Sequence, residues 1–481
     1  MQFNIVPEQI LGFRVAEIQN FRDLLAIFEQ HISRNIEKNK YYEGNISVGS
    51  VNLGIALPNE LKKLEIGCAW GAKTVDVLAA RSMFDGYVGL NGEEVEDMDA
   101  IVANNNLVSE YAKACRNELE YGCTFATLSA DADIGCKIRF HSPQTAAASW
   151  DGEKGRIFRG FAIIDTAPDD VNNYNWTPSL VNYYTEDAIW VIERHQNKNW
   201  YATEHPHRMG RPLMEALIWN ATADKPFGRS RLKEPIRRLI DGYVRTIANA
   251  TIGLEFSTSP QKYLLGITDE QFDAVVNDKF RQYVGSIIAS TSNPETGEKP
   301  TFGQLQQGTI SPHVEMIRIL ATQFSAATGL TVTDVGVVND ANPTSSEAIL
   351  AQSQTLIGMA EQLNLGNGNS LRNIALMALA IVNNVGLDEL EEMDIIAHFK
   401  NPAMPSVAAT TDAAIKIASV RENFANTDTF LEMIGFGQAD IRRIKAEESK
   451  NRGLDVLEEM SNGEDNASTM EAVYSETETN Q

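Results

Sequence analysis

One long stretch of this sequence carries no positive charge. Between Ile319 and Leu371 there is no Lys, Arg or His, and the only charges in its central part, 331–343, are Asp334 and Asp340. Protein surfaces attract nucleic acid through Lys and Arg, which release counterions from phosphate. The stretch is therefore either ordinary neutral structure or a surface over which a polyanion slides without being held. The first alternative needs no special cause, because segments poor in charge occur by chance in long chains.

The motifs that would indicate catalysis or ligand binding are missing. The sequence has no GxxxxGK[ST] loop for phosphate, no GxGxxG after an expected strand and no GxSxG. His205 and His207 lack further His or Cys partners nearby, so a polar turn is favoured over a metal site. Asp131 and Asp133 resemble the start of a calcium loop, but its closing Glu is absent. We therefore expect no catalytic residue, no cofactor and no metal.

The overall composition is that of an acidic globular protein. The chain has 481 residues, 43% of them apolar, and a formal net charge of −24, which allows two to four domains. This charge argues against a general nucleic-acid binder, but not against a protein that encloses DNA without holding it. The cysteines form no CxxC pair, which indicates reduced thiols. We expect no signal peptide and no membrane-spanning helix.

Three basic residues near the C-terminus form a separate cluster. Arg442, Arg443 and Lys445 follow a glycine-containing turn, as in a helix-turn-helix reader of DNA. Glu447 and Glu448 come directly after them, which favours a solvated helix face over a DNA-reading helix.

The apolar periodicity predicts helices, then strands, then helices again. Helices are expected over 15–40, 59–83, 97–121 and 236–254, and residues 213–219 are helix-prone. Short runs rich in β-branched and aromatic residues predict an antiparallel meander, because their connections are too short for helical crossovers. These runs are 123–128, 137–141, 156–165, 179–186, 189–194 and 200–204.

The helices around the cation-free stretch have clear start and stop signals. Ser311 is a good N-cap, Pro312 suits the first helical position, and Gly329 supplies the end. A capping box at 344–347 predicts a long helix to about residue 382, with a kink or break at Gly366 and Gly368. Residues 402–450 are expected to form short helices joined by turns.

The order of several short motifs resembles that of the portal proteins of tailed bacteriophages, the group found in many long-tailed siphoviruses. The best match is NPTSSEA at 342–348, and together the motifs span the chain to about Lys450. The approach to the GRS motif, 209–227, is longer than the family's usual glycine-rich one. The other matching motifs are YYEGN at 41–45, LPNE at 57–60, Trp70 followed by VDVLA at 75–79 and Arg81, YG at 121–122, SP at 142–143, GRS at 228–230 and ATQFSAATG at 321–329.

The resemblance implies an α+β portal fold with wing, stem, clip and crown. The wing would be 1–228, built of N-terminal helices and the β meander, and the stem would be two helices, 229–256 and 311–330. The clip would be a small α/β insertion, 257–310. Residues 331–343 would form a tunnel loop that points at the central axis. They would be followed by a long kinked helix returning to the wing, 344–400, a helical crown, 401–452, and a disordered acidic tail, 453–481.

The resemblance also implies a function and partners. The family forms a ring of usually twelve subunits at one capsid vertex, through which the genome is packaged and ejected. The terminase large subunit docks on the clip and is later replaced by head-completion or adaptor proteins. Major capsid and scaffolding proteins are further partners, and the ring would be assembled in the host cytoplasm and end in the virion. Double-stranded DNA would be held weakly in the channel, and no membrane is involved.

A ring would explain the missing cations, because one Arg in the tunnel loop would become a circle of cations around the DNA. The stem cations are expected to pair mostly with acidic neighbours in the ring, with a few facing the channel, unless they form an ordinary charged helix face. The expected DNA-facing residues are Asp334, Val335, Gly336, Val337, Val338, Asn339, Asp340 and Asn342. The expected basic face of the stem is Arg231, Lys233, Arg237, Arg238 and Arg245. The expected motor-docking residues of the clip are Lys279, Arg281, Glu295, Glu298 and Lys299.

Two other classes of function stay open at the level of sequence. Another structural virion protein, such as a capsid or tail-tube subunit, is disfavoured by the order helix, insertion, helix, loop, long helix. A metal-dependent transferase that uses scattered Asp residues is disfavoured by the missing phosphate and metal motifs.

Overall fold

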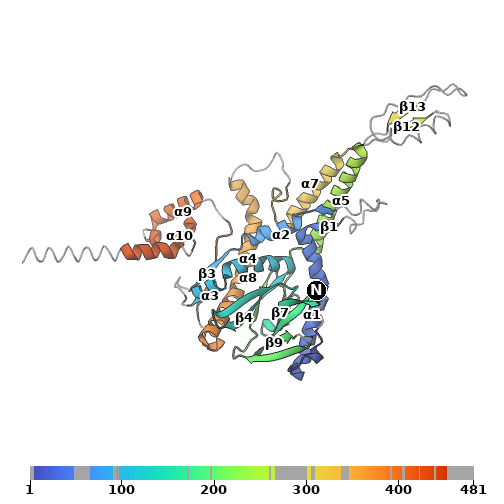
Figure 1. The fold of residues 1–481 in the computed structure, drawn as a ribbon. Helices are drawn as coiled ribbons and strands as arrows, with labels where there is room; N and C mark the ends of the chain where they lie inside the picture. The colour runs from blue at the N-terminus through green and yellow to red at the C-terminus, as the bar shows by residue number, and fades with distance from the viewer. Residues whose placement is uncertain are drawn as a thin grey trace, which may run out of the picture.

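The computed structural model describes most of the chain, and its mixture of helices and antiparallel sheets confirms the α+β class (Figure 1). The described residues are 5–47, 65–89, 95, 97–170, 173–195, 198–258, 262–265, 301–304, 309–336, 346–390, 393–403, 407–421, 423–437 and 440–451. The expected acidic tail, 453–481, lies outside them.

The N-terminal helices are α1 (Val15–Glu43), α2 (Trp70–Ala79), α3 (Met98–Asn104) and α4 (Leu107–Tyr121). The expected helix over 59–83 is too long at both ends. Glu65–Gly67 is strand β2, paired with β1 (Asn45–Ser47), and α2 ends at Ala79. Strand β3 (Phe84–Gly89) follows. The expected single helix over 97–121 is also wrong, because Asn106 takes a left-handed conformation with φ 48° and separates α3 from α4.

The strands form two larger antiparallel sheets, which confirms the predicted meander. One sheet has the order β11-β4-β5 and the other β10-β9-β8-β7-β6. The strands are β4 (Cys123–Asp131), β5 (Gly135–His141), β6 (Ala146–Asp151), β7 (Arg156–Asp170), β8 (Asn173–Tyr184), β9 (Ala188–Arg194), β10 (Trp200–Pro206) and β11 (Met214–Ile218).

The expected helix over 213–219 is wrong. Residues Met214–Ile218 are β11, which pairs with β4, and four of its five residues are buried. A buried strand shows no alternation of apolar and polar residues, so its pattern cannot be told from that of a buried helix. The alanine-rich strand β6 was missed for a similar reason, because its first three residues are all buried.

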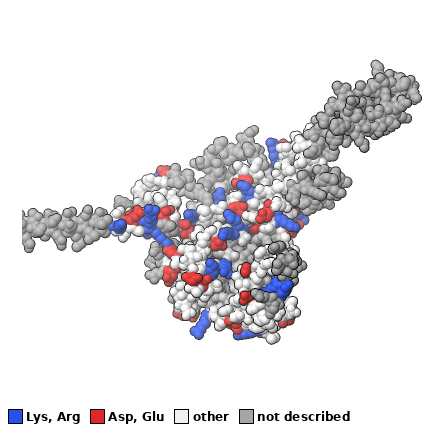
Figure 2. All heavy atoms as spheres, viewed as in Figure 1, with Lys and Arg blue, Asp and Glu red and all other residues white. Residues whose placement is uncertain are grey.

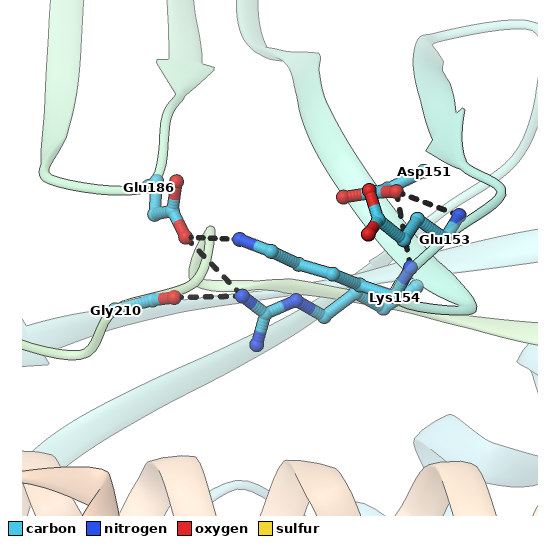
Figure 3. A network of polar contacts seen from close by, with 6 residues as sticks. Asp151, Glu153, Lys154, Glu186 and Gly210 are labelled. Carbon is cyan, nitrogen blue, oxygen red and sulfur yellow. Dashed lines mark hydrogen bonds and ion pairs between the residues drawn. The ribbon is translucent and has the colours of Figure 1, made fainter.

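A polar network joins the β6–β7 turn to the β8–β9 turn (Figure 3). Glu186 accepts from Lys154 Nζ at 2.9 Å and from Arg156 at 3.2 Å, and Arg156 also donates to the Gly210 carbonyl at 2.8 Å. Within the first turn, Asp151 accepts the backbone N–H of Lys154, and this hydrogen bond lowers the pKa of Asp151. The network fixes the ends of neighbouring strands relative to one another.

Two helices, α5 (Glu234–Thr258) and α7 (Ser311–Thr328), run side by side away from the sheets towards the strand pair β12 (Lys262–Leu265) and β13 (Thr301–Gln304) (Figure 1). Both expected helices are confirmed, and α7 ends at Gly329 with φ 75° as predicted. The N-cap of α7 is Ile310 rather than Ser311, without a side-chain cap.

Helix α8 (Ser346–Asn383) crosses the body and is followed by β14 (Ile395–Phe399), which pairs with β3. The expected break at 365–368 is wrong, because the helix is continuous there; a kink stays a prediction. The expected capping box at 344–347 lies partly outside the described residues.

The C-terminal region consists of short helices, as predicted: α9 (Val407–Val420), α10 (Asp428–Ile434) and a further helix over 440–451. The left-handed Gly435 ends α10. The basic cluster of the last helix is ion-paired, since Arg442 contacts Asp99, Arg443 contacts Glu447 and Lys445 contacts Asp428. The structure therefore shows this helix with a solvated face whose basic residues are ion-paired within the chain.

The apolar core is divided in two. The larger cluster joins α2, α4 and the three-stranded sheet to α5, α7 and α8. The smaller cluster packs α1 against the five-stranded sheet through aromatic residues, among them Phe21, Phe161 and Tyr183.

Candidate functional site

The expected tunnel loop begins as an ordered turn directly after α7. Asp334 accepts from Thr331 twice, from the backbone N–H at 3.0 Å and from the hydroxyl at 2.7 Å. The Asp334 N–H donates back to the Thr331 hydroxyl at 3.1 Å. Gly336 N–H donates to the Thr333 carbonyl at 3.0 Å, and φ of Gly336 is 87°. The first acidic residue of the cation-free stretch therefore holds its own turn together.

The turn is also anchored in the core, which corrects one expectation. Val335 was expected to face DNA, but it is buried, with 8% of its surface exposed. Its apolar side chain gains by leaving water, and its carbonyl accepts a hydrogen bond from Trp70 Nε1 at 3.3 Å. Asp334 and Gly336 belong to the described turn, where Asp334 is half-buried and Gly336 is exposed, and their expected contact with DNA stays a prediction. The other five expected residues lie outside the described part of the chain and also stay predictions: Val337, Val338, Asn339, Asp340 and Asn342.

Trp70, at the start of α2, lies between α5 and α7, the two helices expected to form the stem. Its ring centroid is 4.5 Å from that of Tyr243 on α5 and 4.7 Å from that of Phe324 on α7. Tilted aromatic contacts at these distances add to the gain from burial. Helix α2 therefore contacts α5, α7 and the start of the loop through one side chain.

Arg231 makes a second connection at the same place, and its position corrects another expectation. It was expected on the basic face of the stem, but it is buried, with 8% of its surface exposed. Its Nε donates to the Thr74 carbonyl on α2 and its Nη2 to the Thr328 carbonyl on α7, both at 2.7 Å. Burial lowers the pKa of Arg231 to about 10, so it stays charged at neutral pH. Thr328 is the last residue of α7, so its carbonyl has no partner within the helix and is satisfied by Arg231 instead.

The other expected stem cations lie nearer the surface. Arg237 pairs with Glu37 of α1 at 2.8 Å, and Arg238 pairs with Glu234 one helical turn away at 2.5 Å. Lys233, Arg238 and Arg245 are exposed. Over the face that Figure 2 shows, acidic and basic side chains are interspersed. Their expected pairing with neighbours in a ring stays a prediction.

The expected docking residues of the clip, Lys279, Arg281, Glu295, Glu298 and Lys299, lie outside the described residues. The described part of the insertion is the antiparallel pair β12–β13, with Lys262 opposite Gln304 and Leu265 opposite Thr301.

Sequence reasoning missed a buried polar cluster between α4 and α8. Asn367 donates to Glu118 at 2.8 Å and to the Tyr111 hydroxyl at 2.9 Å, and that hydroxyl lies 2.6 Å from Ser82 Oγ. Glu118 is fully buried, which raises its pKa to about 8. A Glu on the inner face of an amphipathic helix was the only local signal of this cluster.

The calcium and metal motifs considered from the sequence have local explanations. Asp131 accepts the backbone N–H groups of Asp133 and Ile134, at 3.0 and 3.2 Å, and so closes the β4–β5 turn. His205 belongs to strand β10, and His207 follows it. In the described part of the chain, no cluster of three or more His, Cys, Asp or Glu residues is suited to a metal ion.

None of the described helices has an apolar run long enough to span a bilayer.

The family model described as "Phage portal protein, SPP1 Gp6-like" matches residues 22–453, and no curated protein matches the chain. Among solved structures, the neck of an empty GTA particle computed with C6 symmetry is similar, with 10% identity and a TM-score of 0.43, covering 74% of this chain and 87% of that one. The neck of a native GTA particle computed with C12 symmetry has 11% identity and a TM-score of 0.42, covering 76% and 89%. Since the family model covers most of its length, this chain belongs to the SPP1 Gp6-like family of phage portal proteins.

Proposed function

We propose that this protein forms a closed ring of twelve subunits at one vertex of a phage capsid. Double-stranded DNA passes through the ring during packaging and ejection, and the protein ends as a component of the virion after assembly in the host cytoplasm. Membership of the portal family supports this role. Cyclic symmetry requires head-to-tail contacts between unlike faces of neighbouring subunits.

The observation that carries the channel proposal is the position of the cation-free stretch. The stretch begins within α7, continues through the loop that starts at Thr331 and includes most of α8. A ring brings all copies of this loop around one axis, so its lack of Lys and Arg leaves the duplex weakly held. The buried Val335, held by Trp70, anchors the described start of this loop and supports the proposal.

Further parts of the proposal concern partners. The terminase large subunit docks on the clip, where Lys279, Arg281, Glu295, Glu298 and Lys299 offer charges of both signs. Head-completion or adaptor proteins replace it after packaging, while major capsid and scaffolding proteins contact the ring during assembly. These assignments rest on membership of the family.

The substitution Asp340→Lys tests the channel proposal, because it would place a circle of positive charges around the DNA. We expect slower packaging at low ionic strength and recovery as salt rises, since salt screens the added contacts. The measurement is the packaging velocity of single particles at two salt concentrations. Asp133→Lys, on an exposed turn of the wing, makes the same change of charge and should leave the velocity unchanged. Equal velocities for Asp340→Lys and wild type at low salt would refute the proposal.

A further inference from the structure

The start of α2 is held against the end of α1 at a distance that only glycine allows. A Cβ on Gly71 would lie 1.9 Å from the Tyr41 carbonyl oxygen. Gly44 ends α1 with φ 73°, and a Cβ there would lie 2.5 Å from the Cys68 carbonyl oxygen. Real Cβ contacts do not reach such distances, so the two helix ends are in direct backbone contact. The position of Trp70, between Cys68 and Gly71, is set by this contact.

The end of α1 is in turn fixed to the first stem helix. The Tyr41 hydroxyl donates to Asp241 at 2.9 Å, and Glu37 pairs with Arg237 at 2.8 Å. The Arg237 guanidinium also lies 5.6 Å from the centre of the Tyr41 ring. Helices α1, α2 and α5 are therefore fixed to one another around Trp70.

The Trp70 side chain extends from these three helices to the loop. The indole is 7% exposed, and its N–H is a donor that needs an acceptor when buried. That acceptor is the Val335 carbonyl. Directly after Val335, Gly336 is exposed, and a Cβ there would meet nothing within 4 Å. Val335, which accepts the hydrogen bond from Trp70, is thus the last buried residue in the described part of the loop.

We infer that Trp70 is a positioning residue for the tunnel loop, and that the wing, through α2, sets where this loop enters the channel. The inference rests on the proposed function for its consequence in DNA passage, but the position of the loop can be measured without DNA. Trp70 acts through the Val335 carbonyl and needs no contact with DNA itself. A tryptophan that only filled the core would need no acceptor on the loop.

The substitution Trp70→Phe tests this, because it keeps an aromatic ring between Tyr243 and Phe324 and removes the N–H. Hydrogen exchange, followed by mass spectrometry of the assembled protein, should become at least fivefold faster over 331–336, since loss of a hydrogen bond at its anchor frees the turn. Exchange within α7 should change much less. Trp200→Phe removes a similarly buried indole from the separate α1–sheet core and should leave exchange over 331–336 unchanged.

A second variant covers the case in which Trp70→Phe disturbs folding. Benzothienylalanine at position 70 has the shape of tryptophan with sulfur in place of the N–H, and it should also speed exchange over 331–336. Unchanged exchange in this variant would overturn the positioning role. If exchange rises while packaging velocity stays at the wild-type value, the positioning role stands and the loop is not in the path of the DNA. If both change, the positioning role and the proposed function are both supported.

Discussion

Glu118 gives the sharpest test of the energetics of this fold. Its carboxyl group is fully buried between α4 and α8, and Asn367 donates to one of its oxygens at 2.8 Å. Burial raises the pKa of Glu118 from 4.5 to about 8, while the hydrogen bond from Asn367 opposes that rise. The folded protein therefore holds this carboxyl group mostly neutral at pH 7, whereas the unfolded chain exposes it as a carboxylate.

The cost of this arrangement follows from proton linkage. Keeping the carboxyl neutral at pH 7, against an unfolded pKa of 4.5, costs about 3 kcal/mol, because each pH unit above the unfolded pKa adds about 1.4 kcal/mol. Because the folded pKa is the higher one, the contribution to stability is fully present below pH 4.5. It is lost as the pH rises towards 8, and above that pH it changes no further.

The substitution Glu118→Gln replaces the carboxyl with a neutral group of the same shape. We expect the unfolding free energy of the wild type to fall relative to that of the variant by about 1.4 kcal/mol per pH unit between pH 5 and pH 8. Urea unfolding followed by circular dichroism at several pH values in this range measures the difference.

The matched control is Glu110→Gln on the same helix. Glu110 is partly exposed and pairs with Lys113 at 2.6 Å, so its removal should leave the pH dependence close to that of the wild type. Parallel pH profiles for the wild type and Glu118→Gln would refute the reasoning, because they would show that Glu118 takes up no proton on folding.

Two glycine substitutions should shift the thermal unfolding midpoint in opposite directions. Gly329→Ala should lower the midpoint and reduce the unfolding free energy by about 1–2 kcal/mol, because φ is 75° and the new Cβ would lie 2.9 Å from Met359 Cε. An unchanged midpoint would show that the end of α7 can adjust. Gly366→Ala should raise the midpoint and increase the unfolding free energy by about 0.5–1 kcal/mol, because the residue is inside α8 and its Cβ would meet nothing within 4 Å. A lower midpoint would mean that the helix needs flexibility at this position.

Sequence patterns predicted the elements that depend on interactions between residues close together in the chain. The end of α7 at Gly329 depends on one left-handed residue, and most strands of the meander are marked by their own β-branched and aromatic residues. The errors came where distant contacts decide. Glu65–Gly67 is a strand because it pairs with Asn45–Ser47, and Met214–Ile218 is a strand because it pairs with β4. No pattern within either segment shows its partner.

The sequence suggested residues 331–343 as a candidate site, but it could not show how this loop is anchored. The missing cations marked the loop from the sequence alone. The contact between Trp70 and Val335 joins residues 265 positions apart, and that of Arg231 with Thr328 spans 97 positions. Similarly, Gly366 and Gly368 suggested a break in α8, but tertiary contacts of Asn367 between them offset the weak helix propensity of glycine. Such contacts depend on the packing of the whole body.

The N-terminal segment pairs with the first residues of β10, at one edge of the five-stranded sheet. Leu11 N–H donates to the Trp200 carbonyl at 2.9 Å, and its carbonyl accepts from Ala202 N–H at 2.8 Å. Gly12 follows with φ 81°, at a position where a Cβ would lie 2.7 Å from the Ala202 carbonyl oxygen. Open strand edges recruit other chains into shared sheets, which leads to aggregation. When copies gather at high local concentration, the start of β10 therefore already has a partner, and a chain shortened past Gly12 would expose it to other chains.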